Sequence, residues 1–262
     1  MTSPACDHPE MNARNTMNAV AAKTGDIGAA FYFTPETTGR GKELGLGGFY
    51  FYFVGRGGVL GDVEPAVIHS AFGYFHPEMV AKMWSGALEK LAPQGLSARD
   101  AAREYIACAH AHGRAHLSDI AGLDAYAAAA RKVIDALDDS GLALFAGVKA
   151  EPVPDDAPAA AFHEAMVLRE LRGSVHLIAV AAAGLRSVTA HAIKRPNDVA
   201  TFGWPEGSVP APSAADIAAR DRAESMTDDI LESAFAVLSE AEAEALIAGT
   251  DAMHAALYPD GR

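Results

Sequence analysis

Apolar residues spaced three and four apart recur along most of this chain, and that spacing is the feature that most limits its fold. One such set runs through residues 77–91 and comprises Met79, Val80, Met83, Trp84, Ala87, Leu88 and Leu91. This is the spacing of a single buried helical face. Alternation with a period of two, which is typical of a half-buried strand, is scarce. The pattern therefore predicts a mainly α-helical protein.

Capping residues and glycines place the expected helix ends. Thr34 and Ser97 each precede a helix-forming stretch and are expected to be N-caps, and His76, before a proline, is expected to cap a helix or join the core. Gly25 and Gly113 are expected to end helices. The expected helices are 12–23, 35–45, 66–74, 77–91, 98–112, 123–137, 159–172, 174–184, 185–194, 214–224, 227–238 and 239–257.

Residues 151–158 form the best candidate boundary, because three prolines and three acidic residues there prevent a helix from continuing. We expect two packed helical lobes, residues 25–150 and 159–262, after a flexible tail or short helix over residues 1–24. Residues 201–212, with three prolines and two glycines, are expected to form a loop.

Composition limits the partners. The formal net charge of -13 repels phosphate backbones, and no basic cluster offsets it, so nucleic-acid binding is disfavoured. The longest apolar stretch, 175–185, falls short of the roughly 20 residues of a membrane span, and the first 18 residues lack the apolar core of a signal peptide. Cys6 and Cys108 give no disulfide framework. We expect a cytoplasmic protein without a membrane partner.

A tract of two arginines, a glutamate and a histidine is the strongest site candidate. Arg169 and Arg172 lie three apart on one helix surface, and a break at Gly173 would expose the N–H groups of a following helix. Such donors suit a carboxylate or phosphate. His176 is then the expected catalytic group for proton transfer. In the alternative interpretation, the arginines balance Glu170 and the helix end, and the histidine is packed.

Five consecutive aromatic residues, 49–53, cannot all face inward on one helix or strand. Tyr50 and Tyr52 need hydroxyl partners if buried, so we expect them, with Trp84, to wall a pocket that is partly apolar and partly polar. Arg56 would supply its charge, unless it is an exposed loop arginine. The other rings suit the core or a subunit contact, which leaves a homodimer open.

Glu104, Cys108 and His112 recur every four residues, and His116 continues the stripe if the helix passes Gly113. These side chains are possible zinc ligands. Because metal sites usually draw ligands from several elements, a surface histidine cluster is favoured, and we assign no metal. The cofactor stays unknown, since the glycine-rich segments lack the strand–turn–helix context of nucleotide-binding loops.

Three short motifs occur in order along residues 32–176. They are Tyr32-Phe33-Thr34-Pro35-Glu36, then Leu44-Gly45-Leu46-Gly47-Gly48-Phe49 with Gly55-Arg56 and Leu60-Gly61, then Leu168-Arg169-Glu170 with Arg172-Gly173 and His176. In this the chain resembles an actinobacterial helix-turn-helix-related family, the SalK-like family, often labelled MarR-like and often encoded among secondary-metabolism genes. The resemblance implies a helical fold whose second half derives from a winged helix, eroded here.

The chain also departs from that family. Members carry Glu-x-x-His where this chain has Gly25 and Gly28, and Arg-Gly-Asp-x-His where it has Ser174. Chemistry that needs those acids is therefore not expected.

Three functions follow from these features. The favoured one is an enzyme or enzyme-like protein of secondary metabolism that acts on a small anionic metabolite between the lobes, with His176 as the catalytic residue. The alternatives are a non-catalytic ligand sensor or carrier, and a MarR-like transcriptional regulator, which the acidic charge disfavours. The expected substrate-binding residues are Glu36, Tyr50, Tyr52, Arg56, Trp84, Arg169 and Arg172.

Overall fold

A computed structural model describes residues 12–261, and those residues form helices without any strand, which confirms the mainly α fold. The helices are α1 (Ala13–Ile27), α2 (Pro35–Glu43), α3 (Phe49–Gly57), α4 (Pro65–Phe72), α5 (Pro77–Leu91), α6 (Ala98–Leu117), α7 (Leu123–Ala136), α8 (Ala143–Lys149), α9 (Ala157–Ala182), α10 (Ser187–Lys194), α11 (Ala214–Phe235) and α12 (Glu240–Leu257). Three short 3-10 turns, η1 (Gly58–Leu60), η2 (Ala92–Gln94) and η3 (Pro196–Asp198), join them. Cys6 and the rest of residues 1–11 lie outside the described residues.

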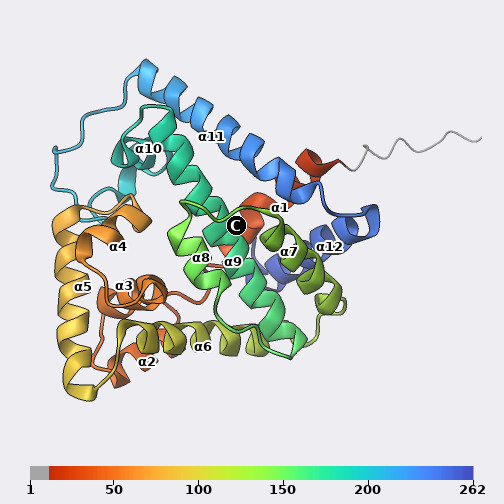
Figure 1. The fold of residues 1–262 in the computed structure, drawn as a ribbon, viewed down its shortest axis with the longest axis horizontal. Coiled ribbons are helices and arrows are strands. Elements are labelled where there is room, and N and C mark those ends of the chain that lie inside the picture. The colour runs from red at the N-terminus through yellow and green to blue at the C-terminus, as the bar shows by residue number, and fades with distance from the viewer. Residues whose placement is uncertain (1–11, 262) are drawn as a thin grey trace, which may run out of the picture.

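The long helix α9 is the centre of the molecule (Figure 1). It packs against α6, α7 and α11, and also against α1 and α8. One hydrophobic core extends from Met17 of α1 to Met253 of α12 and so includes side chains from both sides of the non-helical segment 151–156. The division into two lobes stays a prediction.

The expected helix caps are confirmed. Thr34 and Ser97 each accept a hydrogen bond from a backbone N–H three residues along the chain. The Nδ1 atom of His76 accepts one from the backbone N–H of Glu78, 3.3 Å away. Because each cap satisfies an N–H group that the helix itself leaves unpaired, these helix starts are fixed locally by sequence.

Three glycines that were expected to end or break helices lie inside them, so those predictions are wrong. They are Gly25 in α1, Gly113 in α6 and Gly173 in α9. At Gly113 a Cβ atom would lie 2.7 Å from the carbonyl oxygen of Pro158, so the glycine allows α6 and α9 to approach closely. A helical glycine costs only about 1 kcal/mol relative to alanine, which the buried apolar face of a long helix outweighs.

Two expected breaks between helices are also absent, because the helices continue through them. The helices expected over 159–172 and 174–184 form the single helix α9, and those expected over 214–224 and 227–238 form α11, which ends at Phe235. The continuous α9 leaves no free helix amino terminus at Ser174, so backbone N–H groups there are not available to an anion.

Helices α9 and α10 form a bent pair with an angle of 112° between them. The turn between them spans residues 183–186, and in it Gly184 adopts a positive φ of 73°. Among residues 12–261 no single helix is both long and apolar enough to cross a membrane, and only this bent pair, taken together, reaches that length and composition.

One half of helix α10 is covered by its neighbours. The hydroxyl of Ser187 donates to the carbonyl of Gly73 at 2.5 Å, and the ring of His191 packs on that of Phe202 with centroids 4.1 Å apart. Half of the helix is therefore inaccessible. Its buried residues are Val188, Ala190, His191 and Ala192.

Candidate functional site

The structure divides the charged residues of the predicted site between two clusters, both centred on α9. The buried arginine cluster consists of Tyr32, Tyr52, Arg56, Arg169 and Glu170. The α9–α11 cluster consists of Arg172, His176, Lys194, Arg220 and Glu224. Arg56 and Arg169 thus share one carboxylate, whereas Arg172 and His176 surround another.

Glu170 holds the buried arginine cluster together. Arg56 donates to both of its carboxylate oxygens, at 2.8 and 3.0 Å, and Arg169 donates at 2.6 Å. Tyr32 donates its hydroxyl hydrogen at 3.3 Å. Helix α3 places Tyr52 one turn before Arg56, whose Nη1 donates to the Tyr52 hydroxyl at 2.7 Å. The side chain of Glu170 is only 6% exposed, so this is an interior ion cluster.

The positive charges in this cluster keep Glu170 ionised. Burial alone would raise the pKa of Glu170, but the positive charges of Arg56 and Arg169 outweigh it and lower that pKa. The Arg56 guanidinium also lies over the ring of Phe72, 4.5 Å from its centroid. Because the donors of Arg56 are turned to Glu170 and Tyr52, a structural role accounts for its contacts.

The α9–α11 cluster is arranged around Glu224 of α11. Arg172 donates to one carboxylate oxygen at 2.9 Å and Arg220 to the other at 2.7 Å. The side chains of these three residues are 20–30% exposed, so solvent reaches the cluster. Each guanidinium commits a single nitrogen to the carboxylate, and a guanidinium carries five N–H donors. Donor capacity therefore remains at a surface that a solute can reach.

A neighbouring threonine fixes the tautomer of His176. The Thr227 hydroxyl donates to the carbonyl of Ala223 at 2.7 Å, so its oxygen accepts from His176 Nδ1, which lies 2.9 Å away. The ring proton is then on Nδ1, and Nε2, 3.9 Å from a carboxylate oxygen of Glu224, carries a lone pair. Burial lowers the pKa of His176, so the ring is neutral at pH 7. His176 is therefore equipped to accept a proton at Nε2.

The cluster carries an excess of positive charge in an acidic protein. Burial and the nearby charges of Arg172 and Arg220 lower the pKa of Lys194. Burial would raise the pKa of Glu224, but the hydrogen bond from Arg172 and the surrounding positive charges lower it. Arg172 and Arg220 contact Glu224, and the exposed Lys194 adds a third positive charge nearby. Such a site attracts anions.

Three of the predicted substrate-binding residues lie elsewhere. The ring of Tyr50 lies under the Lys90 ammonium group, 5.2 Å away. Trp84 is fully buried, and its indole N–H donates to the carbonyl of Val63 at 2.7 Å. Glu36 is exposed in the first turn of α2. Their proposed binding roles stay predictions, and none of the contacts found within residues 12–261 joins them to either cluster.

The possible metal stripe on α6 has other partners. The helix passes Gly113, so Glu104, Cys108, His112 and His116 do share one helix. Glu104, however, accepts from Arg40 at 3.0 Å, and the rings of His112 and His116 pack with centroids 4.3 Å apart. Within the described part of the chain, no group of three or more His, Cys, Asp or Glu side chains is placed to hold a metal ion.

Sequence reasoning missed three of the five residues of the α9–α11 cluster, Lys194, Arg220 and Glu224. Arg220 and Glu224 lie four apart, a spacing that signals a helical ion pair, but they belong to a helix that the sequence marks only as acidic. Nothing in the sequence links them to Arg172, 52 residues from Glu224. Thr227, which orients the histidine, carries no signal of its own.

Comparison with known proteins gives one family. A family model described as a helix-turn-helix family matches residues 17–206, which is more than half of the chain. No curated protein and no solved structure matches the chain. The matched range includes Arg172, His176 and Lys194 and ends before α11, which supplies Arg220 and Glu224.

Proposed function

This chain belongs to that helix-turn-helix family, and we propose that it binds a small carboxylate or phosphate at the α9–α11 cluster, with His176 accepting a proton from the bound molecule. The observation that carries the proposal is that two partly exposed guanidinium groups share a single carboxylate, next to a neutral imidazole of fixed tautomer. The narrower resemblance to SalK-like proteins stays a prediction.

Charge and donor count both favour an anion here. The cluster holds three positive charges, from Arg172, Arg220 and Lys194, and one negative charge, from Glu224. One incoming anion therefore still leaves it neutral or positive. Charge-assisted hydrogen bonds from guanidinium to carboxylate or phosphate are among the stronger ones in proteins. The buried arginine cluster is the poorer binding site, because Arg56 already donates to both oxygens of Glu170 and to Tyr52, and Glu170 is only 6% exposed.

The histidine decides between an enzyme and a sensor. A base needs a lone pair near the proton that it removes and a pKa that leaves it unprotonated at working pH. His176 meets both conditions, since Nε2 faces the cluster and burial lowers its pKa. A ligand held by Arg172 and Arg220 lies on this side of the ring. We therefore place the enzyme-like function ahead of the ligand sensor or carrier.

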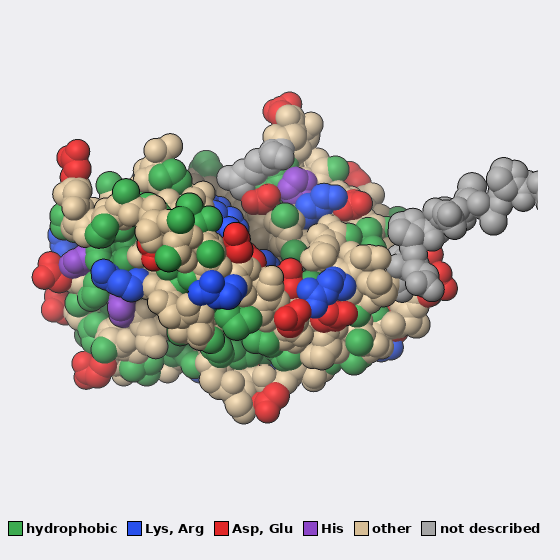
Figure 2. Space-filling model, turned by 90° about the horizontal axis from the view of Figure 1, so that it is seen from above, with side chains coloured by type: hydrophobic (Ala, Val, Ile, Leu, Met, Phe, Trp, Pro, Cys, Tyr) green, Lys and Arg blue, Asp and Glu red, His purple; other side chains and the backbone are tan. Residues whose placement is uncertain are grey.

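A DNA-binding regulator is the second candidate, and the bent pair α9–α10 favours it. Its 112° angle and glycine-containing turn have the geometry of a helix-turn-helix motif, whose second helix reads the major groove. Here, however, half of α10 is buried. On the face seen in Figure 2, lysine and arginine side chains stand singly or beside acidic ones, without a continuous basic strip. We therefore rank DNA binding below anion binding.

Thermal unfolding tests the binding site. Inorganic phosphate, added to the protein in a constant sodium chloride background, is expected to raise the melting temperature in a saturable manner, because a ligand that binds only the folded state stabilises it. Arg172→Gln is expected to abolish the rise. Arg114 lies on α6 and forms an exposed ion pair with Asp156. Arg114→Gln makes the same charge change there and serves as the matched control. An unchanged melting temperature with phosphate, acetate and benzoate would contradict the proposal.

A gel-shift experiment tests the second candidate. The chain at low salt is expected not to retard a promoter fragment from beside its own gene, because phosphate contacts supply most of the affinity of DNA-binding proteins and this chain carries a net charge of -13. Retardation of that fragment that weakens steeply with added salt would reverse the ranking of the two functions.

A further inference from the structure

The α4–α5 turn, residues 73–76, is held in place by three other segments. A Cβ atom on Gly73 would lie 2.3 Å from the Cδ2 atom of Leu177, so the turn lies directly against α9. The hydroxyl of Ser187, on α10, donates to the carbonyl of Gly73 at 2.5 Å. The indole N–H of Trp204 donates to the carbonyl of Tyr74 at 2.9 Å. The backbone at Tyr74 is therefore fixed.

The side chain of Tyr74 reaches the α9–α11 cluster. Its ring packs on the ring of His191 of α10, with centroids 5.7 Å apart. Burial raises the pKa of Tyr74 to about 12, and the charge of Glu224 acts in the same direction. The charges of Arg172 and Arg220 oppose this rise. Because the effect of a charge weakens with distance, the Tyr74 hydroxyl lies near these three residues.

The Tyr74 hydroxyl is a donor that the described part of the protein leaves unused. Its raised pKa keeps it protonated at pH 7, and within residues 12–261 it has no hydrogen-bond partner. The residue is only partly buried, so a solute that reaches the cluster also reaches this hydroxyl. The donors there thus come from three segments: α9 with Arg172, α11 with Arg220, and the α4–α5 turn with Tyr74.

We propose that the α9–α11 cluster takes the tetrahedral phosphate group of a small phosphate ester rather than a carboxylate, and that Tyr74 donates its hydroxyl hydrogen to the third phosphate oxygen. This inference rests on the function proposed above, in which Arg172 and Arg220 bind the anion. Two guanidinium groups are enough to take one oxygen each of a planar carboxylate. A phosphate group presents a third oxygen outside that plane, which a donor on another segment can reach.

Charge favours the same ligand. The cluster has two positive charges in excess, because Arg172, Arg220 and Lys194 face the single carboxylate of Glu224. A phosphate group carries about −1.5 to −2 charges at pH 7, whereas a carboxylate carries one. A phosphate ester therefore balances the cluster, and a carboxylate leaves it positive.

Calorimetric titration with methylphosphonate and with acetate tests the proposal, because both carry one methyl group and they differ in the anionic group. The wild-type protein is expected to bind methylphosphonate more tightly than acetate. Tyr74→Phe keeps the ring and removes only the hydroxyl. It is expected to bind methylphosphonate about tenfold more weakly, as the loss of one hydrogen bond to a charged group predicts, and acetate within about twofold of the wild type.

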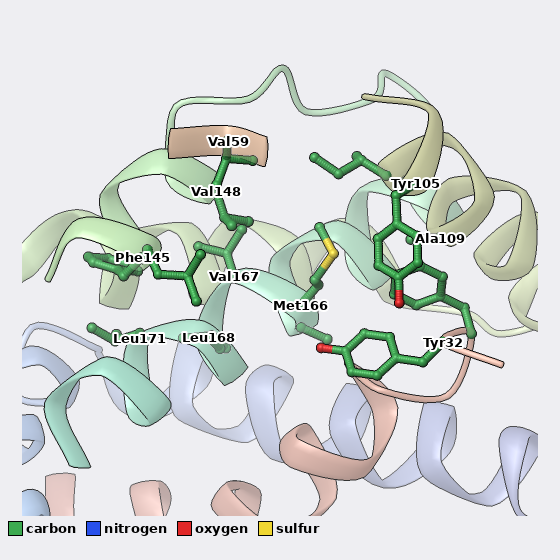
Figure 3. Close-up of a cluster of buried hydrophobic side chains, with 14 of the residues drawn as sticks. Tyr32, Val59, Tyr105, Ala109, Phe145, Val148, Met166, Val167, Leu168 and Leu171 are labelled. Carbon is green, nitrogen blue, oxygen red and sulfur yellow. The ribbon is translucent and has the colours of Figure 1, made fainter. Parts of the chain in front are cut away.

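Tyr105→Phe is the matched control. The Tyr105 hydroxyl also lacks a partner among the described residues, and the residue is 2% exposed. Figure 3 shows it in the hydrophobic core near Tyr32, and the centroids of the two rings are 5.9 Å apart. Burial raises its pKa, and the charged groups that act on it are Arg56 and Arg169 of the buried arginine cluster. This variant is expected to bind both anions as the wild type does.

The outcomes separate this inference from the proposed function. If the wild-type protein binds neither anion, both are wrong. If it binds both anions and Tyr74→Phe binds methylphosphonate as tightly as the wild type, the role of Tyr74 is wrong and the anion site stands. An equal loss of affinity for the two anions in Tyr74→Phe also overturns the inference, because the hydroxyl would then act on the arginines and not on a third oxygen.

Discussion

The two arginine clusters lie less than one turn apart along α9, yet they differ in burial and in what their carboxylates do. Glu170 is buried and accepts from two arginines and a tyrosine, so the cluster around it is closed. Glu224 is a quarter exposed and accepts one nitrogen from each of two arginines. Arg169 and Arg172, three residues apart on one helix, therefore have different roles.

The difference shows that a cluster of arginines on a helix is not by itself a ligand site. Spacing along the helix decides which side chains share a face, but burial and the partner element decide whether their donors remain available. Arg169 and Arg172 are similarly exposed, at 27% and 30%, but Arg169 donates to the buried Glu170 whereas Arg172 donates to Glu224, which is 25% exposed. The comparison leads to four expectations, from the largest effect to the smallest.

Removing the central carboxylates should have very unequal costs. Glu170→Gln leaves the largely buried Arg56 and the partly exposed Arg169 without their counter-charge and is expected to lower the free energy of unfolding by about 3–5 kcal/mol. Glu224→Gln is expected to cost only about 0–1 kcal/mol, because its ion pairs are partly exposed. Urea unfolding of both variants measures the difference. Equal losses would mean that the two clusters are not distinct in kind.

Glu224→Gln should also strengthen anion binding. The carboxylate occupies the region that a bound phosphate would approach, and like charges about 4 Å apart repel by roughly 1 kcal/mol in water-like surroundings. The affinity for inorganic phosphate is therefore expected to rise about fivefold, as measured by calorimetry. A loss of affinity instead would show that Glu224 is needed to hold Arg172 and Arg220 in place.

The pH dependence should come from His176. Burial lowers its pKa below the ordinary 6.5, so the ring becomes a cation only as the pH falls below that value. Sulfate, which does not titrate in this range, is expected to bind about two- to fivefold more tightly once the ring is charged. The unliganded protein loses stability over the same descent, since its folded state resists protonation. A His176→Gln variant with the same pH profile would contradict this role.

The smallest effect concerns the tautomer of His176. Thr227→Val removes the oxygen that accepts from Nδ1, so the proton is expected to redistribute between the two ring nitrogens, which nitrogen-15 chemical shifts report directly. The variant is expected to lose only about 1 kcal/mol of stability, the usual worth of a hydrogen bond. Unchanged ring shifts would show that another group fixes the tautomer.

Local sequence signals were sufficient for the fold class and for three helix starts. Caps at Thr34, His76 and Ser97 depend on contacts within three residues, which a sequence displays directly. The predicted helix ends at Gly113 and Gly173 were wrong, because a helix continues through a glycine when the residues on either side face a core. That core is a property of the packed molecule.

The candidate site was predictable only in part, for the same reason. The sequence marks Arg172 and His176, which share α9. It does not show that α11 lies across from them, so Arg220, Glu224 and Thr227 were missed. The sequence also grouped Arg56 with them. Arg56 instead pairs with the buried carboxylate of Glu170, 2.8 Å away, and only the folded structure shows this contact.

Mapping a sulfate titration onto the backbone amides of the isotope-labelled protein tests the central claim most directly. Saturable shift changes are expected at Arg172 and His176 on α9 and between Arg220 and Thr227 on α11, while the amides of Tyr32 and Arg56 stay in place. Changes centred on the buried arginine cluster, or no saturable changes at all, would contradict the assignment of the anion site to the α9–α11 cluster.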